Sequence, residues 1–276
     1  MRKLILISNP GSVEEGNHQP VTEIVINRYA GFFRSNIGGK WNDEDHEIEL
    51  YGENRELTVE RMDEIMEELD SPECTYSMIV FCGHGTEAGN GEDGIQLPRN
   101  NHAVLNCYRV SRLLSLYEPY EVRRRIKRTV IIDACRAIQP ITPAQLFEGG
   151  LQREIALIDG TRCKNYYNWL IEQEYPHVEL LQSTSPNRPA YPTPTGSEYA
   201  DQVLNLIFSY ARVWRARAIQ NIQNGLFDFS MKDLHDYVTD GIARTTQRQI
   251  PQYSVAGRLR NGFPFVAISS RANLFG

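Results

Sequence analysis

Two strand-like apolar runs that each end in a short polar motif constrain the fold of this chain more than any other feature. The run 76–82 is followed by Gly83-His84-Gly85, and the run 129–133 leads into Asp133-Ala134-Cys135-Arg136. The carboxyl ends of neighbouring parallel strands meet at one edge of an open α/β sheet. A thiol needs a nearby base to be deprotonated at neutral pH. The two motifs therefore predict that His84 and Cys135 meet at that edge as base and nucleophile.

Composition and charge limit the class of protein. The chain has 276 residues, 41% of them hydrophobic, which is enough to bury one large core or two modest ones. No apolar run approaches the length that crosses a bilayer, and residues 1–3 lead directly into a strand-like run with no cleavage-site pattern. A formal charge of −6 argues against a surface that binds nucleic acid. We expect a cytoplasmic protein with no membrane or nucleic-acid partner.

The run 123–128 holds five basic residues in six and is the exception to the acidic balance. It stands between a predicted helix and the strand that leads to Asp133. A solvated, cationic helix end is the ordinary explanation, because basic side chains favour the carboxyl end of a helix. A docking surface for a partner is the alternative.

The cysteines form no Cys-x-x-Cys pair, and their number is odd. This pattern disfavours a disulfide framework and a structural zinc site, and it fits reduced thiols in a cytoplasm. The five are Cys74, Cys82, Cys107, Cys135 and Cys163.

Strand-like segments alternate with helical patterns along the chain. This βαβ series predicts an α/β protein with a three-layer α/β/α fold, in which helices cover both faces of a mostly parallel sheet of about six strands. No linker divides the chain, so we expect a single domain over 1–276. The predicted strands cover 4–8, 47–51, 76–82, 129–133, 178–182 and 263–268. The predicted helices begin near residue 21, after Thr58, near residues 110 and 166, at a capping box over 195–198, and after Ser230.

The chain resembles the caspase-type peptidases, the family that includes caspases, metacaspases and paracaspases. The caspase signature is Gln-Ala-Cys-(Arg/Gln/Gly)-Gly, with the catalytic histidine about 50 residues upstream. Cys135 follows His84 by about that separation, but Asp133 replaces the Gln and Ala137 replaces the last Gly of the signature. Further similarities run in order from about residue 3 to 268. They are Leu57-Thr58-Val59-Glu60, Ser183-Thr184 with Gly196-Ser197, and 249–252 with Phe263-Pro264-Phe265.

The resemblance implies a prokaryotic-style caspase-like cysteine endopeptidase with a large-subunit-like half (1–136), an intersubunit-like connection (137–182) and a small-subunit-like half (183–276). Cys135 would attack the peptide carbonyl, and His84 would accept the thiol proton and protonate the leaving amine. The backbone amides of Gly85 and Cys135 would form the oxyanion hole. This chemistry needs no metal and no organic cofactor.

Each catalytic assignment has an alternative explanation. Cys135 could be a small core residue, and His84 could pack in a turn between two glycines. His102 is the nearest substitute for the base, because it lies in the loop region that follows His84. We interpret Cys82 and Cys107 as structural.

Substrate preference depends mainly on Asp133. The resemblance implies that relatives with Gln two residues before the nucleophile prefer Asp at P1, whereas metacaspases and paracaspases carry Asp there and prefer Arg or Lys. A carboxylate would pair with a cationic P1 side chain and repel an anionic one. Glu23 is a candidate second acidic wall. The alternatives are a strand-end cap for Asp133 and an exposed helix carboxylate for Glu23.

Regulation is only partly visible in the sequence. Arg153, Arg162 and Lys164 stand where caspases are cut during maturation, and they would suit an enzyme specific for basic P1 residues. We expect a protein or peptide substrate and consider a regulatory protein partner, with monomer and homodimer both open. Calcium, which metacaspases often bind, is not favoured because the loop with Glu87, Glu92 and Asp93 lacks a dense Asp pattern.

Other functions compete with this interpretation. The protein could be a caspase-like protease with an Asp or neutral P1 preference, or a catalytically silent caspase-like interaction module. The intact His84 and Cys135 argue against the silent module. A flavodoxin-like ligand-binding domain is disfavoured, because no Gly-rich phosphate loop follows Ser8 and Asn9-Pro10-Gly11-Ser12 is too short a match.

Overall fold

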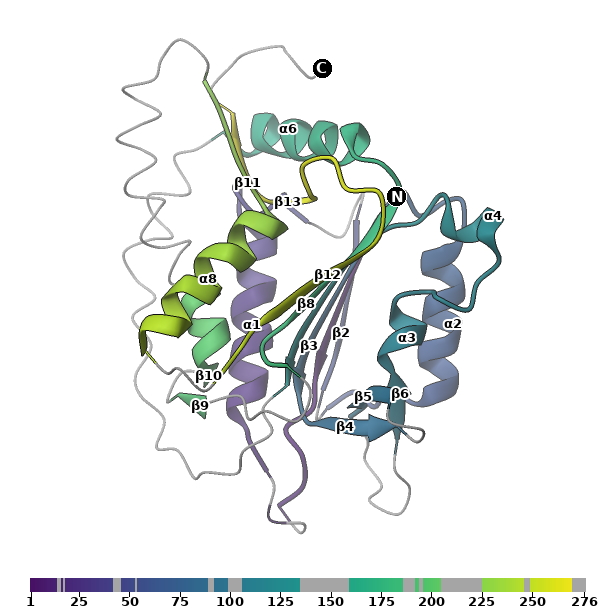
Figure 1. Ribbon diagram of the computed structural model, residues 1–276, viewed down its shortest axis with the longest axis vertical. Helices are drawn as coiled ribbons and strands as arrows, with labels where there is room; N and C mark the ends of the chain where they lie inside the picture. Colours follow the sequence, from purple (N-terminus) through teal and green to yellow (C-terminus); the bar gives the residue numbers. More distant parts are fainter. Residues whose placement is uncertain are drawn as a thin grey trace.

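A six-stranded sheet forms the centre of the protein (Figure 1). The computed structural model describes residues 1–13, 16, 18–41, 46–52, 54–88, 92–98, 106–134, 159–185, 192–193, 196–204, 225–245 and 249–269. The strand order is β12-β8-β7-β3-β1-β2, and all neighbours are parallel except β12 and β8. The strands are β1 (Arg2–Ser8), β2 (His46–Tyr51), β3 (Tyr76–Gly83), β7 (Lys127–Ala134), β8 (His177–Gln182) and β12 (Gln252–Gly257). The predicted mostly parallel sheet of about six strands is confirmed.

Side chains alternate between two cores because successive residues of a strand point to opposite faces. On β1, Leu4 and Leu6 join one core, and Ile5 and Ile7 join the other. The first core packs against α1 (Val21–Arg34), α6 (Gly160–Gln173), α8 (Met231–Thr245) and the helical residues 198–204. The second packs against α2 (Val59–Asp70) and α3 (Val110–Leu113). Helices therefore cover both faces, as Figure 1 shows for α1 and α8 on one side and α2 and α3 on the other.

Local sequence explains where the covering helices begin. Thr58 caps α2 as predicted, since its hydroxyl accepts a hydrogen bond from the Arg61 amide at 3.2 Å. Asp159 caps α6 with one carboxylate oxygen that accepts from the Thr161 and Arg162 amides. α6 therefore begins six residues before the predicted start, because the capping aspartate and not the first apolar residue sets the boundary.

A three-stranded antiparallel ribbon follows β3 at the carboxyl edge of the sheet. Its strands are β4 (Gly85–Ala88), β5 (Glu92–Gln96) and β6 (Cys107–Arg109). The short α4 (Tyr120–Arg123) stands on the way from α3 to β7. The only residue between β3 and β4 is His84.

The predicted last strand does not belong to the central sheet. β13 (Pro264–Ser269) pairs with β11 (Leu226–Ser230) in a separate antiparallel ribbon. The sixth strand of the sheet is β12, which we did not predict. Its residues alternate between exposed and half-buried positions, so it lacks the apolar run that marked the inner strands. A further two-residue pair joins β9 (Pro192–Thr193) and β10 (Gly196–Ser197).

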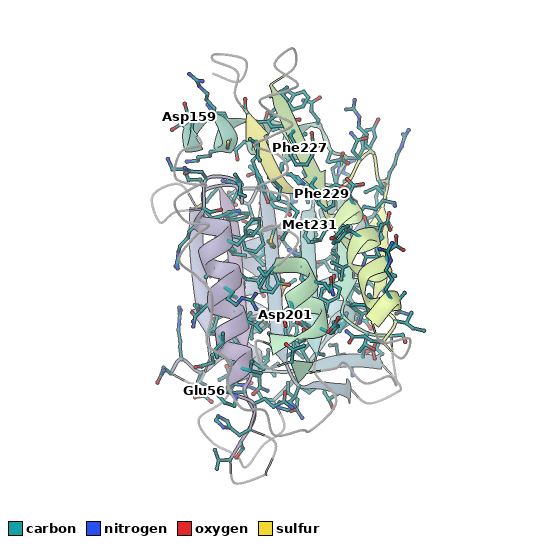
Figure 2. The ribbon with its side chains drawn as sticks, turned by 90° about the vertical axis from the view of Figure 1, so that its left-hand side faces the viewer. Glu56, Asp159, Asp201, Phe227, Phe229 and Met231 are labelled. Atoms are coloured by element: carbon teal, nitrogen blue, oxygen red, sulfur yellow. The ribbon has the colours of Figure 1, made fainter. Side chains whose placement is uncertain are left out.

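The face covered by α1 and α8 is shown in Figure 2. Phe227 and Phe229 lie on β11 and Met231 begins α8, so this ribbon feeds directly into the covering helix. Asp201 lies on the helical segment beside α1, where it pairs with Arg28 at 2.9 Å. Among the described helices, none is long and apolar enough to cross a membrane.

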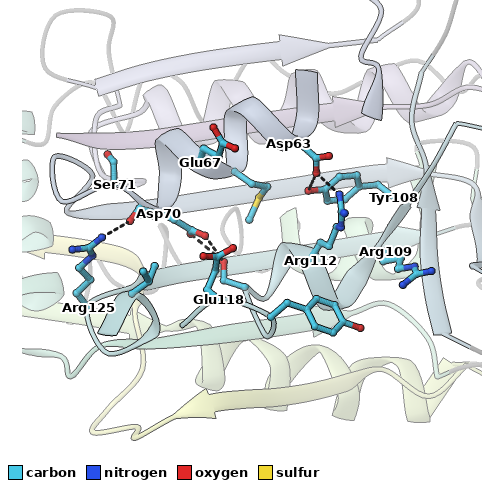
Figure 3. Close-up of a pocket in the computed structure, with 13 residues that line it drawn as sticks. Asp63, Glu67, Asp70, Ser71, Tyr108, Arg109, Arg112, Glu118 and Arg125 are labelled. Carbon is cyan, nitrogen blue, oxygen red and sulfur yellow. Dashed lines mark hydrogen bonds and ion pairs between the residues drawn. The ribbon is translucent and has the colours of Figure 1, made fainter. Parts of the chain in front are cut away.

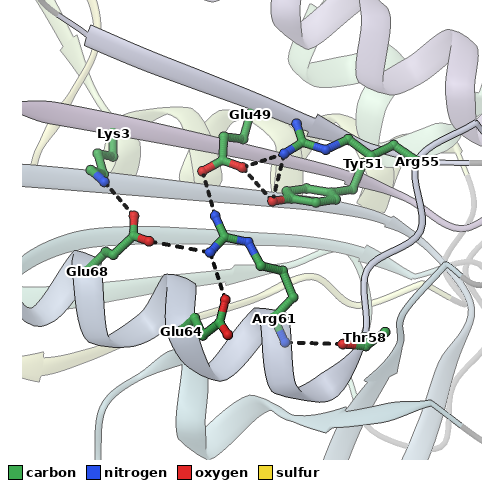
Figure 4. Close-up of polar contacts among 8 residues, drawn as sticks. All are labelled: Lys3, Glu49, Tyr51, Arg55, Thr58, Arg61, Glu64 and Glu68. Atoms are coloured by element: carbon green, nitrogen blue, oxygen red, sulfur yellow. Dashed lines mark hydrogen bonds and ion pairs between the residues drawn. The ribbon is translucent and has the colours of Figure 1, made fainter.

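The open edge of β2 carries a charged network (Figure 4). The buried Glu49 carboxylate accepts hydrogen bonds from Tyr51 and from Arg55 at 2.9 Å. Arg61 of α2 reaches the same carboxylate and Glu68, which also pairs with Lys3 at 2.7 Å. Charges of this kind discourage edge-to-edge pairing with another chain.

Candidate active site

The strand ends that carry the two motifs are direct neighbours in the sheet. β3 and β7 run parallel, and their register aligns Cys82 with Asp133 and Gly83 with Ala134. His84 directly follows Gly83. Cys135, which directly follows Ala134, lies outside the described residues. The structure therefore brings the residues before His84 and Cys135 into one aligned pair.

His84 is half-buried and marks the point where the chain leaves the central sheet. Its carbonyl oxygen accepts a hydrogen bond from the Gln96 amide of β5 at 3.0 Å. Gly85 is the first residue of β4 and pairs with Ile95. The backbone around His84 is therefore held both by the end of β3 and by the ribbon.

Asp133 is completely buried at the end of β7. Ser197 donates a hydrogen bond to its Oδ2, and the same Ser197 oxygen accepts from the Ala200 amide at 2.9 Å. Burial raises the pKa of Asp133 to about 6, although the hydrogen bond from Ser197 works in the opposite direction. Ser197 therefore caps the helical segment 198–204 and binds the carboxylate. The sequence correctly places a helix start here, but the cap is Ser197 and not the first residue of the predicted capping box over 195–198, and Thr195 lies outside the described residues.

Four small polar side chains lie in a row across four neighbouring strands. Ser8 aligns with Cys82, Cys82 aligns with Asp133, and Ser183 continues β8 next to Ile132, whose carbonyl accepts from its amide at 2.9 Å. All four are at most 1% exposed. The row faces α1, because Leu6 and Ile131, two residues before Ser8 and Asp133, belong to the core on that side.

Two tyrosines cover this row. Tyr29 of α1 and Tyr199 of the segment 198–204 are both fully buried, and burial together with the charge of Asp133 raises the pKa of each. Among the described residues, neither hydroxyl has a hydrogen-bond partner, and the same holds for Oδ1 of Asp133. Buried polar atoms without partners are unusual in folded proteins, so this cluster is a notable feature of the site.

Glu23 lies at the same edge of the sheet but two strands away from Asp133. It belongs to the first turn of α1. A β-carbon on Gly52, at the end of β2, would stand 3.0 Å from its Oε1 and 3.6 Å from the β-carbon of Ser8. The order β7-β3-β1-β2 places β1 about 10 Å from β7. Gly52 thus leaves room for the Glu23 carboxylate beside Ser8.

The other residues that the sequence singled out fall in several places. Cys82 is buried on β3, and Cys107 is half-buried on β6. His102 and Arg153 lie outside the described residues, as does the side chain of Glu87. Arg162 and Lys164 lie within α6, so a protease that binds extended chain could cut there only after the helix unwinds.

The basic run 123–128 is not simply a solvated helix end, and that prediction is wrong for its last residue. Arg128 lies in β7 and is fully buried, where it donates to Ser77, Ser115, the Leu113 carbonyl and Asp70. Burying a guanidinium is costly unless it is paired, and Asp70 supplies the partner at 2.6 Å. Residues 123–125 are exposed near the end of α4, and Lys127 is half-buried.

A hollow of about 700 Å³ lies on the α2 face, beside α3 and α4 (Figure 3). At one end Asp63 accepts from Tyr108 at 2.8 Å and from Arg112 at 2.5 Å. At the other end Asp70 is bound by Ser115. Asp63 and Asp70 are thus both bound by side chains of the lining. Within the described part of the chain, no group of three or more His, Cys, Asp or Glu side chains could hold a metal ion.

Sequence reasoning missed the contacts around Asp133. The Gly196-Ser197 pair was noticed through the resemblance and as part of a capping box, with no link to Asp133, and Tyr29 and Tyr199 gave no signal beyond helical apolar spacing. Asn9 was noticed only as a phosphate-loop match that failed. These residues are remote from Asp133 or His84 in sequence, and only the fold brings them together.

The protein has a three-layer α/β fold, and polar side chains gather at the carboxyl edge of its central sheet. A family model described as the caspase domain matches residues 28–261. The chain therefore belongs to the caspase-domain family of peptidases. A search among curated proteins found no match.

The comparison with solved structures gives a match that supports the same fold. The Drosophila initiator caspase Dronc matches with a TM-score of 0.53 at 9% identity, over 96% of this chain and 81% of Dronc. Caspase-1 from Spodoptera frugiperda matches with a TM-score of 0.49 at 10% identity, over 92% of this chain and 85% of its own. A protein from Geobacter sulfurreducens gives 0.49 at 14% identity, over 98% and 97%. The likeness to Dronc concerns the fold alone.

Proposed function

We propose that this protein is a cysteine endopeptidase with a His84/Cys135 dyad that cleaves after Arg or Lys. The observation that carries the proposal is the alignment of Gly83 with Ala134 on neighbouring parallel strands. Adjacent strands are about 4.8 Å apart, which is within reach of a histidine and a cysteine side chain that follow aligned positions. The family supplies the reaction class, since its members are peptidases.

The reaction proceeds by attack of the Cys135 thiolate on the peptide carbonyl carbon. His84 takes the thiol proton and then delivers it to the leaving amine, so that an acyl-enzyme forms and water hydrolyses it. The Gly85 amide and the Cys135 amide donate to the oxygen on which negative charge develops. The Gln96 contact supports these roles because it fixes the backbone between His84 and Gly85.

A basic P1 preference is supported by the buried cluster around Asp133. Its carboxylate has one oxygen without a partner among the described residues, and the nearby Tyr29 and Tyr199 hydroxyls can also accept hydrogen bonds. A guanidinium or ammonium group brings the donors and the positive charge that this cluster lacks. Because Asp133 is fully covered, the P1 side chain must displace whatever covers it. Glu23 is proposed as a second acidic group at the same edge.

Matched peptides that differ only at P1 test both parts of the proposal. Wild type should cut P1-Arg and P1-Lys peptides and leave P1-Asp peptides intact, and Asp133→Asn should reduce the preference for the basic residues at least 10-fold.

Cys135→Ala and His84→Ala should each lower turnover by several orders of magnitude, whereas Cys107→Ala should not. Turnover that survives in either dyad variant would remove the mechanism. A wild type that cuts no peptide and binds another protein would favour the silent interaction module.

A further inference from the structure

Asn9 occupies the carboxyl edge of the sheet directly beside the residues that flank His84. It is the first residue after β1 and is 8% exposed. Its amide donates to the Cys82 carbonyl at 2.9 Å, which extends the β1–β3 ladder by one bond. A β-carbon on Gly83 would stand 2.7 Å from the Asn9 carbonyl oxygen and 2.9 Å from its β-carbon. Asn9 therefore packs directly against Gly83, the residue before His84.

The side chain of Asn9 reaches the other flank of His84. Its Nδ2 donates to the Gln96 carbonyl at 2.7 Å, while the Gln96 amide donates to the His84 carbonyl at 3.0 Å. The Oδ1 atom accepts from the Gly11 amide at 3.0 Å, which sets the Asn9 side chain in a local turn. The backbone of Gln96 thus links the two residues, since its carbonyl accepts from the Asn9 side chain and its amide donates to the His84 carbonyl.

We propose that Asn9 is a positioning residue that sets the place of His84 relative to the nucleophile; this inference rests on the proposed function. His84 is the single residue between β3 and β4, so its backbone is fixed by the ends of these two strands. Asn9 fixes Gly83 by contact and the His84 carbonyl through Gln96. A base must stay within about 0.5 Å of its productive geometry, and a displacement of about 1 Å can lower the rate about 100-fold.

Asn106 offers a matched control. Its Nδ2 donates to the Leu57 carbonyl at 2.7 Å, and its own carbonyl accepts from the Leu97 amide at 2.7 Å. It therefore makes the same kind of side-chain bond, of the same length as that of Asn9, beside the same ribbon. None of these Asn106 contacts involves Gly83, His84 or Gln96, so its loss should weaken the fold without moving the base.

The experiment compares Asn9→Asp and Asn9→Ala with Asn106→Asp and Asn106→Ala in the full chain. Asn9→Asp keeps the acceptor for Gly11, replaces the donor to Gln96 by an oxygen and adds a negative charge, for which Asn106→Asp is the matched control, so it tests the bond even if Asn9→Ala unfolds. We expect both Asn9 variants to lower kcat at least 10-fold with KM changed less than about 2-fold, while the Asn106 variants keep kcat within about 3-fold at a similar loss of Tm. Equal losses of kcat in the two pairs, or an effect confined to KM, would overturn the inference.

A second measurement separates this inference from the proposed function. The rate at which iodoacetamide alkylates Cys135, mapped by mass spectrometry, is measured at pH 6.5, well below the ordinary thiol pKa of about 8.5. If Asn9 positions His84, the Asn9 variants should lose at least about 5-fold in this rate and the Asn106 variants should match wild type. Equal rates in all of them would overturn the positioning role. If the wild type cleaves no peptide, the proposed function is refuted, and the alkylation rates of the Asn9 variants relative to wild type still decide the positioning role.

Discussion

Ser197 donates a hydrogen bond to the buried carboxylate of Asp133 and uses the same oxygen to accept the amide of Ala200. The two residues lie on different elements, one at the end of β7 and the other at the start of the helical segment 198–204. A single hydroxyl therefore joins the capping of a helix to the charge state of the carboxylate that is proposed to bind the P1 side chain. Because Asp133 can gain or lose a proton, this coupling makes the stability of the protein depend on pH through that one carboxylate.

Removal of the Ser197 hydroxyl should destabilise the protein more than removal of a simple cap. Ser197→Ala loses the cap and leaves the Asp133 carboxylate without its donor, and we expect a loss of about 2–3 kcal/mol in the free energy of unfolding at pH 8. Thr58→Ala, which removes only the cap of α2, should cost about 1 kcal/mol. Urea denaturation of both variants checks the difference. Equal losses would mean that the bond to Asp133 contributes nothing to stability.

The charge of Asp133 should make the wild type less stable as pH rises through its folded pKa. That pKa is raised from 3.8 to about 6, so between these values the folded state binds more protons than the unfolded state. Stability is then greatest below about pH 4 for this group and falls until about pH 6, by on the order of 3 kcal/mol at most. Asp133→Asn cannot ionise and keeps an acceptor for Ser197. Its Tm relative to wild type should rise between pH 4 and 7, and a constant difference would contradict the assignment.

The buried pair of Arg128 and Asp70 should be much more sensitive than an exposed pair on the same face. Asp70→Asn leaves a fully buried guanidinium without its carboxylate, which should cost about 3 kcal/mol or more. Asp63→Asn weakens the pair with Arg112, in which both side chains are more than 40% exposed, and should cost less than about 1 kcal/mol. Denaturation midpoints at neutral pH measure both. Similar costs would show that Arg128 is compensated mainly by Ser77, Ser115 and the Leu113 carbonyl.

The inner strands could be predicted from sequence because both of their faces are buried. β3 is buried along its whole length, and β7 along all but its first residue, so each appears as a continuous apolar run. β12 has a half-exposed pattern at the edge of the sheet, and no such run marks it. Arg128 was misjudged for a related reason, since its burial depends on Asp70, which lies far from it along the chain.

The proposed site was predictable only at its motifs. His84, Gly85 and Asp133 could be placed at strand ends because each stands in a short motif beside a strand-like apolar run. The contact between Asp133 and Ser197 joins residues that are 64 positions apart, and that between Asn9 and Gln96 joins residues that are 87 apart. Pairing over such separations depends on how helices cover the sheet, which local patterns do not encode.

Gly83 should tolerate no side chain, and its replacement should affect both stability and catalysis. A β-carbon there would stand 2.7 Å from the Asn9 carbonyl oxygen, so Gly83→Ala must push the end of β1 away from β3. We expect a loss of about 1–3 kcal/mol, as for other overpacked sites, and a fall in kcat of at least 10-fold because His84 is the next residue.

The control is Gly31→Ala in α1, where a β-carbon meets nothing within 4 Å. That change should stabilise the helix by about 0.5–1 kcal/mol and leave kcat unchanged. Thermal denaturation and peptide cleavage by both variants measure these effects, and full activity in Gly83→Ala would show that the position of His84 does not depend on its contact with Asn9.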